Sequence, residues 1–227
     1  MKAVIAIDSF KGSLTSLEAG NSAATGIRRV FPDAECIVRP LADGGEGTVD
    51  ALVAACAGKN VEISVTGPLG APVLCRYGII EKTKTAIIEM SGAAGITLVP
   101  TSERNPLFTT TFGVGEVIQD AIEKGSRHFI IGIGGSATND GGAGMLQALG
   151  FSLCDKNGAP IRPGALGLKD LASIDDKNAL PELKDCTFRI ACDVTNPLCG
   201  EKGCSAVFGP QKGADEPMIH KMDQWLP

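Results

Sequence analysis

The sequence predicts an α/β fold, and three observations lead to this prediction. Short apolar runs repeatedly lead into a glycine-containing loop and then into a helical pattern, which is typical of βα units. The 227 residues are 44% hydrophobic and 21% charged, as in a globular chain that can form one large domain or two small ones. The 29 glycines stand beside apolar runs, which favours tight loops between strands and helices over a disordered linker.

The N-terminal part of the chain contains two βα units. Residues 2–7 form an apolar strand that leads into a polar loop beginning at Asp8. Thr15 and Glu18 have the spacing of a capping box, which predicts the start of a helix. A second short strand leads into the glycine loop 40–48 and another helical pattern. Because α/β proteins bind their ligands beyond the carboxyl ends of strands, both loops are candidate functional segments.

Four charged residues in these loops are candidates for function, and three of them have a structural alternative. Asp8 can be a simple helix-entry residue, and Lys11 can be a solvated surface charge. Glu46 stands where a helix N-terminus favours an acid in any case. Asp43 is followed by two glycines that give a ligand access to it, and carboxylates so placed commonly hold magnesium or accept a proton.

The character of the sequence changes near Gly67. Residues 73–80 and 85–90 read as two strands around a short polar turn and predict an antiparallel hairpin, unlike the units before it. We therefore expect a domain boundary near Gly67. Residues 68–227 would then form a second α/β domain, with a mixed sheet.

The stretch 128–150 resembles a phosphate cradle. Residues 129–133 predict a buried strand, residues 134–142 are almost all small, and residues 143–149 predict a helix that Gly150 ends. Successive backbone N–H groups in such a loop, with a helix N-terminus behind them, can converge on a phosphate. The alternative is a tight strand-to-helix turn that binds nothing.

The C-terminal part of the chain contains one more candidate acid. Residues 187–192 predict a buried strand, and Asp193 follows it directly; the alternative is an Asx-turn at the strand end. Residues 159–186 are loop-rich and weakly periodic. Residues 218–226 have an amphipathic helical pattern, whose Trp and Leu we expect either to dock onto the molecule or to be covered by further chain.

Composition and missing motifs argue against several classes of protein. A net charge of −5 argues against a nucleic-acid partner. No apolar segment approaches the ~20 residues that span a bilayer, and the N-terminus does not read as a secretory signal, so we expect a cytoplasmic protein with no membrane partner and with its eight cysteines reduced. The P-loop signature is absent. Ala137 stands where a dinucleotide-binding fingerprint needs its third glycine, which weakens the case for an oxidoreductase.

Four long motifs, in this order, resemble the bacterial glycerate kinase family that makes 2-phosphoglycerate. They read DSFKGSLTS, PLADGGEGT, GIGGSATNDGGAGMLQALG and CDVTNPLCGEKGCSAVFGPQKGA, at residues 8–16, 40–48, 132–150 and 192–214. The resemblance implies two α/β domains, with residues 1–67 as the first part of a flavodoxin/Rossmann-like domain with a mainly parallel sheet. Members of the family continue beyond this C-terminus, and their remaining chain completes that domain and part of the cleft.

The implied reaction transfers the γ-phosphoryl group of ATP to the 2-hydroxyl of D-glycerate with Mg²⁺. Lys11 would neutralise the phosphoryl group or the glycerate carboxylate. Asp43 or Asp193 would deprotonate the hydroxyl, and the other would hold the metal. The expected phosphate-binding residues are Gly134, Gly135, Ser136, Ala137, Thr138, Asn139, Asp140, Gly141 and Gly142. The expected substrate-binding residues are Asp8, Ser9, Lys11, Gly44, Gly45 and Glu46.

The partner implied by this reaction is the small-molecule substrate, and a homodimer is the assembly we consider. Two other functions stay open at this point. One is a non-catalytic domain that binds a nucleotide or another anion. The other is a nucleotide-dependent oxidoreductase.

Overall fold

A computed structural model describes residues 1–8, 10, 13–41, 44–45 and 47–227. The strands form three sheets. A parallel pair joins β1 (Lys2–Ile7) to β2 (Glu35–Pro40), and an antiparallel pair joins β7 (Ser152–Cys154) to β8 (Ser173–Asp175). The third sheet has five strands. The fold is therefore a mixed α/β fold, as the sequence predicts.

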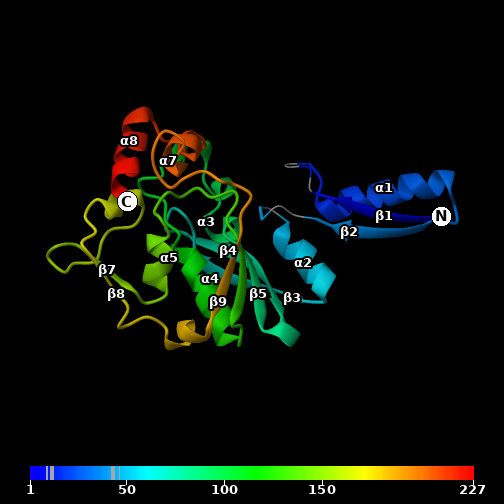
Figure 1. Cartoon of the computed structure of the whole chain (residues 1–227), viewed down its shortest axis with the longest axis horizontal. Coiled ribbons are helices and arrows are strands. Elements are labelled where there is room, and N and C mark those ends of the chain that lie inside the picture. The colour runs from blue at the N-terminus through cyan, green and yellow to red at the C-terminus, as the bar shows by residue number, and fades with distance from the viewer. Residues whose placement is uncertain (9, 11–12, 42–43, 46) are drawn as a thin grey trace.

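The unit of β1, α1 (Ser16–Val30) and β2 extends away from the rest of the molecule (Figure 1). The predicted capping box is present, because the Thr15 side chain accepts from the backbone N–H of Glu18 and the Glu18 side chain accepts from that of Thr15. The Ser16 hydroxyl donates to the Ile7 carbonyl at 2.5 Å and accepts from the Leu41 N–H at 3.1 Å. This hydroxyl ties the carboxyl ends of both strands to the start of the helix.

The five-stranded sheet has the order β3-β4-β5-β6-β9. The first three strands are antiparallel and the last three are parallel, and Ile88, Ile131 and Ile190 are in register across the parallel part. The hairpin predicted after Gly67 is confirmed. The strands are β3 (Lys59–Thr66), β4 (Pro72–Ile80), β5 (Thr85–Glu89), β6 (His128–Gly132) and β9 (Thr187–Ala191).

The sheet continues across the expected boundary at Gly67. Strand β3 precedes Gly67 and pairs along its whole length with β4, which follows it. Helix α2 (Thr48–Cys56) also packs on β4 and β5, with Val49 and Val53 against Ile87. A division into two domains stays a prediction, and the strand pairing favours a place for it between β2 and α2.

The main core lies between the five-stranded sheet and α4 (Phe112–Glu123), with α5 (Ala143–Ala148) beside that helix. Tyr77 is fully buried in this core, and its hydroxyl donates to Asp120 at 2.5 Å. The hydrogen bond and the burial both raise the pKa of Tyr77 above its usual value, burial having the larger effect. This core fixes the position of α5, which follows the glycine-rich loop.

Shorter elements fill the remaining chain. The α-helices are α3 (Ser91–Ala94), α6 (Ala165–Leu168), α7 (Cys204–Phe208) and α8 (Glu216–Trp225). The 3₁₀ turns are η1 (Glu81–Thr83), η2 (Ile96–Leu98), η3 (Thr101–Glu103), η4 (Pro181–Asp185) and η5 (Pro210–Lys212). Among the helices that the structure describes, none is both long enough and apolar enough to cross a bilayer.

The prediction that residues 187–192 form a buried strand is wrong in one respect. The strand is present, but β9 lies at the edge of the sheet, where Phe188 is 42% exposed and Ile190 is 54% exposed. An apolar run alone does not show whether both faces of a strand are covered. At the C-terminus, Met222 is fully buried, and Trp225 and Leu226 are partly buried, so α8 docks onto the molecule.

Candidate functional site

Loops from strands of two different sheets meet at their carboxyl ends. Gly44 lies after β2, and its carbonyl accepts from the N–H of Gly134, after β6, at 3.4 Å. Gly44 has a φ of +92°, and a Cβ at this position would lie 2.7 Å from the carbonyl oxygen of Ala191, the last residue of β9. A residue with a side chain would be strained there and would push the loops apart. The glycine therefore lets three strand ends share one edge.

The predicted site residues are distributed around this edge. Gly44 and Gly45 lie beside the loop that begins at Gly134, and Asp193 is exposed two residues beyond β9. Asp8 is half-buried, directly after β1. The other four predicted residues lie outside the described part of the chain. These are Ser9, Lys11, Asp43 and Glu46.

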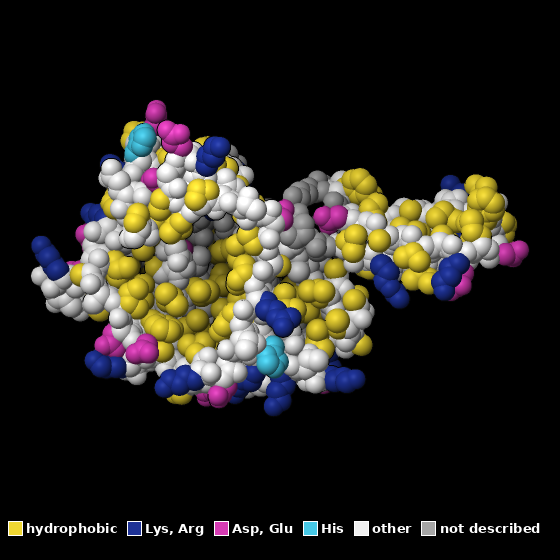
Figure 2. All heavy atoms as spheres, viewed as in Figure 1, with side chains coloured by type: hydrophobic (Ala, Val, Ile, Leu, Met, Phe, Trp, Pro, Cys, Tyr) yellow, Lys and Arg dark blue, Asp and Glu magenta, His cyan; other side chains and the backbone are white. Residues whose placement is uncertain are grey.

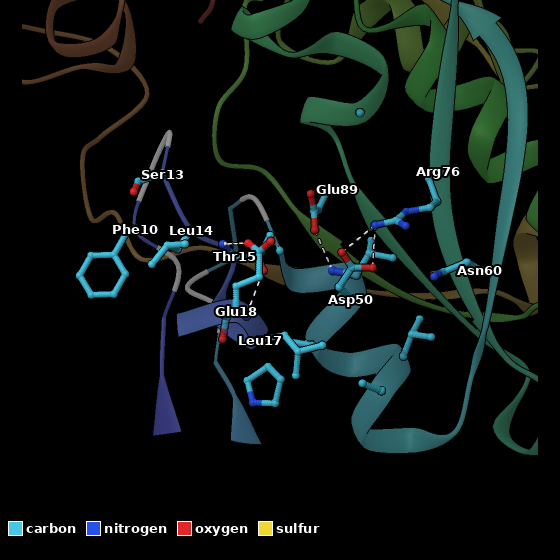
Figure 3. Close-up of a pocket in the computed structure, with 18 residues that line it drawn as sticks. Phe10, Ser13, Leu14, Thr15, Leu17, Glu18, Asp50, Asn60, Arg76 and Glu89 are labelled. Atoms are coloured by element: carbon cyan, nitrogen blue, oxygen red, sulfur yellow. Dashed lines mark hydrogen bonds and ion pairs between the residues drawn. The ribbon is translucent and has the colours of Figure 1, made fainter. Parts of the chain in front are cut away.

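A cleft of about 820 Å³ separates the start of α1 from α2, β4 and β5. Figure 3 shows Thr15 and Glu18 on one side of it, with Glu89, Asp50 and Arg76 on the other. Glu89 ends β5, and its carboxylate accepts from the N–H of Val49 at 2.7 Å, in the first turn of α2. An acid is favoured there by the helix dipole.

The carboxylate of Asp140 holds the far end of the glycine-rich loop together. Asp140 is only 1% exposed. Its Oδ2 accepts from the N–H and hydroxyl of Thr111 at 2.9 and 2.8 Å and from the N–H of Gly144 at 3.2 Å, while Oδ1 accepts from the N–H of Gly142 at 3.2 Å. Donors at the start of α5 are thus already occupied. The geometry gives Asp140 a structural role.

The middle of the loop has backbone donors that are available. The loop is anchored by its carbonyl at Gly135, which accepts from Ile96, and by its N–H at Ala137, which donates to Ala94, each at 2.8 Å. The N–H groups of Ser136 and Thr138 have no hydrogen-bond partner within residues 1–8, 10, 13–41, 44–45 and 47–227. An anion is the kind of group that such donors bind.

Lys212 approaches the same segment from η5. Its Nζ donates to the hydroxyl of Ser136 at 2.8 Å and to the carbonyl of Thr138 at 2.6 Å. The side chain is only 7% exposed. Burial lowers the pKa of Lys212 to about 8, against weaker opposing effects of Cys204 and Asp140. The ammonium form therefore still predominates at pH 7 and gives this loop a local positive charge.

An apolar hollow of about 650 Å³ adjoins the loop. Ser136 and Thr138 line it on one side, and the exposed faces of β6 and β9 line it on another, with Ile133, Phe188 and Ile190. Figure 2 shows it as a depression surrounded by hydrophobic side chains, below the region of α7 and α8. The glycine-rich loop therefore lies between the buried ammonium of Lys212 and this apolar hollow.

No role was predicted from the sequence for Lys212 or Glu89. Glu89 follows the apolar run of β5, which is the same signal that selected Asp8 and Asp193. Lys212 lies within the last of the four motifs, but a lysine between polar residues and glycines reads as a surface charge, and only the fold shows that it is buried. No group of three or more His, Cys, Asp or Glu side chains within the described chain could hold a metal ion.

Known proteins of one family match this chain from end to end. The model of the glycerate kinase family matches residues 3–227. Glycerate 2-kinase of Escherichia coli (strain K12) is 54% identical over 226 residues, which cover 100% of this chain and 59% of that protein. Glycerate kinase of Bacillus subtilis (strain 168) is 53% identical, with 99% of this chain and 59% of that protein covered.

A solved structure agrees with these matches. The crystal structure of a Salmonella typhimurium LT2 protein, assigned as glycerate kinase 2, has a TM-score of 0.90 to this chain at 53% identity, over 100% of this chain and 60% of that one. Fold and loops together define an α/β protein whose polar segments gather at the ends of its strands. The chain belongs to the glycerate kinase family, and it spans about 59% of the length of the curated relatives described here.

Proposed function

We propose that this chain forms part of a kinase that transfers the γ-phosphoryl group of ATP to the 2-hydroxyl of D-glycerate, giving 2-phosphoglycerate. The observation that carries this proposal is the glycine-rich loop, whose free N–H groups lie against a buried ammonium at the edge where strand ends meet. Phosphoryl transfer depends mainly on positioning and on neutralising negative charge, which are what such a loop supplies.

The other predicted residues would act as the base, neutralise charge and bind the substrate. A carboxylate, from Asp43 or Asp193, accepts the proton of the 2-hydroxyl as its oxygen bonds to the γ-phosphorus. The bond from that phosphorus to the bridging oxygen breaks, and ADP leaves. Lys11 offsets charge on the phosphoryl group or on the glycerate carboxylate. Asp8, Ser9, Gly44, Gly45 and Glu46 would contact the substrate.

Magnesium fits this arrangement without a cluster of protein ligands. Mg²⁺ is usually held by one or two carboxylates together with phosphate oxygens and water. Whichever of Asp43 and Asp193 is not the base would hold the ion, which neutralises phosphate charge when bound. Asp193 is exposed at the end of β9, where its carboxylate is accessible to a bound nucleotide.

The decisive experiment is an ATP-dependent phosphorylation assay with D-glycerate, in which NMR identifies the phosphorylated hydroxyl. The 227-residue chain is compared with a fusion that adds the C-terminal part of the Escherichia coli relative. We expect the fusion to form 2-phosphoglycerate. Formation of 3-phosphoglycerate, or no phosphorylated product from the fusion, would contradict the proposal.

A non-catalytic binding domain is the second candidate, because the chain covers only 59% of its relatives. Calorimetry with ATP and magnesium distinguishes the two. If the 227-residue chain binds ATP but only the fusion turns over, the chain by itself is a binding domain. Turnover by the chain alone would exclude that reading.

A further inference from the structure

Lys212 is a buried charge without an acidic partner in the described part of the chain. An ammonium group has three protons to donate, and the two hydrogen bonds to Ser136 and Thr138 use two of them. Neither acceptor carries a charge. Because buried charges in proteins are ordinarily paired, the charge of Lys212 is only partly balanced: the Asp140 carboxylate acts on it electrostatically but is hydrogen-bonded to Thr111 and to the start of α5 instead.

Arg104 is a second cation in the same region. Its Nε is buried and has no hydrogen-bond partner, and no ion pair involves its guanidinium among the residues described. The segments of the two cations touch, because a Cβ on Gly213, at φ +90°, would lie 2.8 Å from the carbonyl carbon of Arg104. Thr109, five residues beyond Arg104, donates its hydroxyl to the carbonyl of Ala137 at 2.8 Å. This hydrogen bond ties the segment that follows Arg104 to the glycine-rich loop.

The Ser136 hydroxyl can connect Lys212 to a bound ligand through hydrogen bonds. Its hydroxyl oxygen accepts from Lys212, which leaves its own O–H free to donate. Ser136 also lines the apolar hollow. A ligand beside the loop would meet this hydroxyl and the free N–H groups of Ser136 and Thr138, with the lysine charge directly behind them.

We propose that Lys212 and Arg104 flank a binding site for the polyphosphate chain of a nucleoside triphosphate on the segment 136–138. Arg104 donates to the phosphate oxygens, and Lys212 is a positioning residue that orients the Ser136 hydroxyl and supplies charge. This inference rests on the proposed kinase function, from which the identity of the ligand is taken. It adds two cations for which the sequence had predicted no role.

The chemistry favours a polyphosphate over a simple carboxylate. Two cations and several neutral donors offer more positive potential than the single charge of glycerate requires. Away from Ser136 and Thr138, the hollow of about 650 Å³ is lined largely by apolar side chains, which suits a nucleobase better than a carboxylate.

The test measures binding of inorganic tripolyphosphate and of ATP by calorimetry at pH 7. Lys212→Met and Arg104→Gln are compared with the native chain, and Lys202→Met, a change of an exposed lysine, is the matched control. We expect each site variant to weaken both ligands tenfold or more, and the control to leave them unchanged. Urea unfolding of every variant shows whether a loss of binding reflects a loss of fold.

A structural role alone would not reproduce the pH dependence we expect. Tripolyphosphate loses its last proton in the same pH range, so the Lys212→Met profile serves as the reference for the ligand. The affinity of the native chain relative to that of Lys212→Met should fall as Lys212 loses its proton. The Asp140 carboxylate is one group that acts on Lys212 electrostatically. Cys204 is the other titratable group that faces Lys212, and Cys204→Ser removes its contribution. If Lys212→Met does not fold, Ser136→Ala and Arg104→Gln carry the same test.

The outcomes separate this inference from the proposed function. If ATP binds the native chain and all site variants equally, the polyphosphate site is wrong and the kinase proposal stands. If tripolyphosphate binds the fusion through Lys212 and Arg104 but ATP binds neither the fusion nor the 227-residue chain, the anion site stands and the kinase proposal fails. If neither ligand binds the fusion or the 227-residue chain, both are wrong.

Discussion

Because Lys212 is buried, the free energy of unfolding of the chain should depend on pH. Its pKa is about 8 in the folded chain, against an ordinary lysine value of 10.5, so between these pH values the unfolded chain binds more protons. The free energy of unfolding contributed by Lys212 therefore rises with pH across this window. The gap of about 2.5 pH units corresponds to roughly 3 kcal/mol.

We predict that the native chain gains about 3 kcal/mol relative to Lys212→Met between pH 7 and pH 10.5, because the variant has no buried charge to lose. Urea unfolding across this range gives the difference. Cys75, whose pKa burial raises to about 11, affects both chains alike and cancels. A difference that stays constant with pH would show that Lys212 is not desolvated. Lys202→Met should differ from the native chain equally at every pH.

The second residue prediction concerns the two candidate carboxylates. Asp43→Asn and Asp193→Asn should each lower kcat at least ~100-fold in the fusion with turnover, since a positioned base is typically worth that much or more. The base variant should also lose the acidic limb of the pH–rate profile. The metal-ligand variant should instead recover activity at high Mg²⁺. Near-normal kcat in either variant excludes that residue, and Glu62→Gln, on an exposed part of β3, is the control.

Local sequence patterns suggest candidate residues but do not reveal distant contacts. Asp8 and Asp193 were selected because an acid after an apolar strand is a local pattern, and their roles stay predictions. Asn139 and Asp140 were assigned to a ligand, yet their side chains bind other parts of the chain: Asn139 donates to Ser205 at 3.0 Å, and Asp140 holds Thr111. These partners lie 29 or more positions away in the sequence, so no local pattern could reveal them.

At the scale of elements, long periodic segments were predicted well and short ones were not. Strands β1, β4 and β5 and the capped start of α1 lie within a residue or two of their expected positions. Strand β8 and helix α6 fall in the segment 159–186, where no element was predicted. Each has only three or four residues, so tertiary contacts rather than propensity must stabilise it.

Two glycines within helices should respond oppositely to the same change. Gly26 in α1 has open space around it, so Gly26→Ala should stabilise the chain by up to ~1 kcal/mol through helix propensity. Gly115 in α4 faces α5, where an added Cβ would lie 2.6 Å from the Cβ of Ala148 and closer still to the carbonyl of Met145. Despite the same gain in propensity, Gly115→Ala should destabilise by about 1 to 3 kcal/mol through overpacking.

Urea unfolding of both variants tests this prediction. Because α5 begins directly after the glycine-rich loop, Gly115→Ala should also weaken ATP binding, while Gly26→Ala should not. Equal stabilisation by the two substitutions would show that α4 and α5 are less closely packed than the structure indicates.

At the scale of the whole molecule, the fold class predicted from the sequence is confirmed, while the division into two domains stays a prediction. The change in pattern near Gly67 is real, but it marks the turn of the β3–β4 hairpin. A hairpin turn and a linker share glycine and proline, and only strand pairing distinguishes them. The three core clusters draw on residues from Val49 onward, which sets the unit of β1, α1 and β2 apart from the main core.

This separation predicts unequal stability within the chain. The pair β1–β2 is covered by α1 on one face, while Val4 is 63% exposed on β1 and Val30 is 70% exposed at the end of α1. A two-stranded sheet with so little burial is marginal by itself, whereas Ile87 and Ile88 of β5 are fully buried. We expect backbone amides of β1 to exchange at least ~100-fold faster than those of β5, because local opening costs less free energy than global unfolding.

Hydrogen exchange followed by mass spectrometry measures both strands in one experiment. Strand β3 is the control, since it is also an edge strand but belongs to the five-stranded sheet, so its protection separates the effect of an edge from that of a weakly buried unit. Equal protection of β1 and β5 would contradict the prediction. The experiment also tests the homodimer: if self-association covers the exposed face of β1, its protection must rise with protein concentration, whereas an uncovered unit exchanges at the same rate at every concentration.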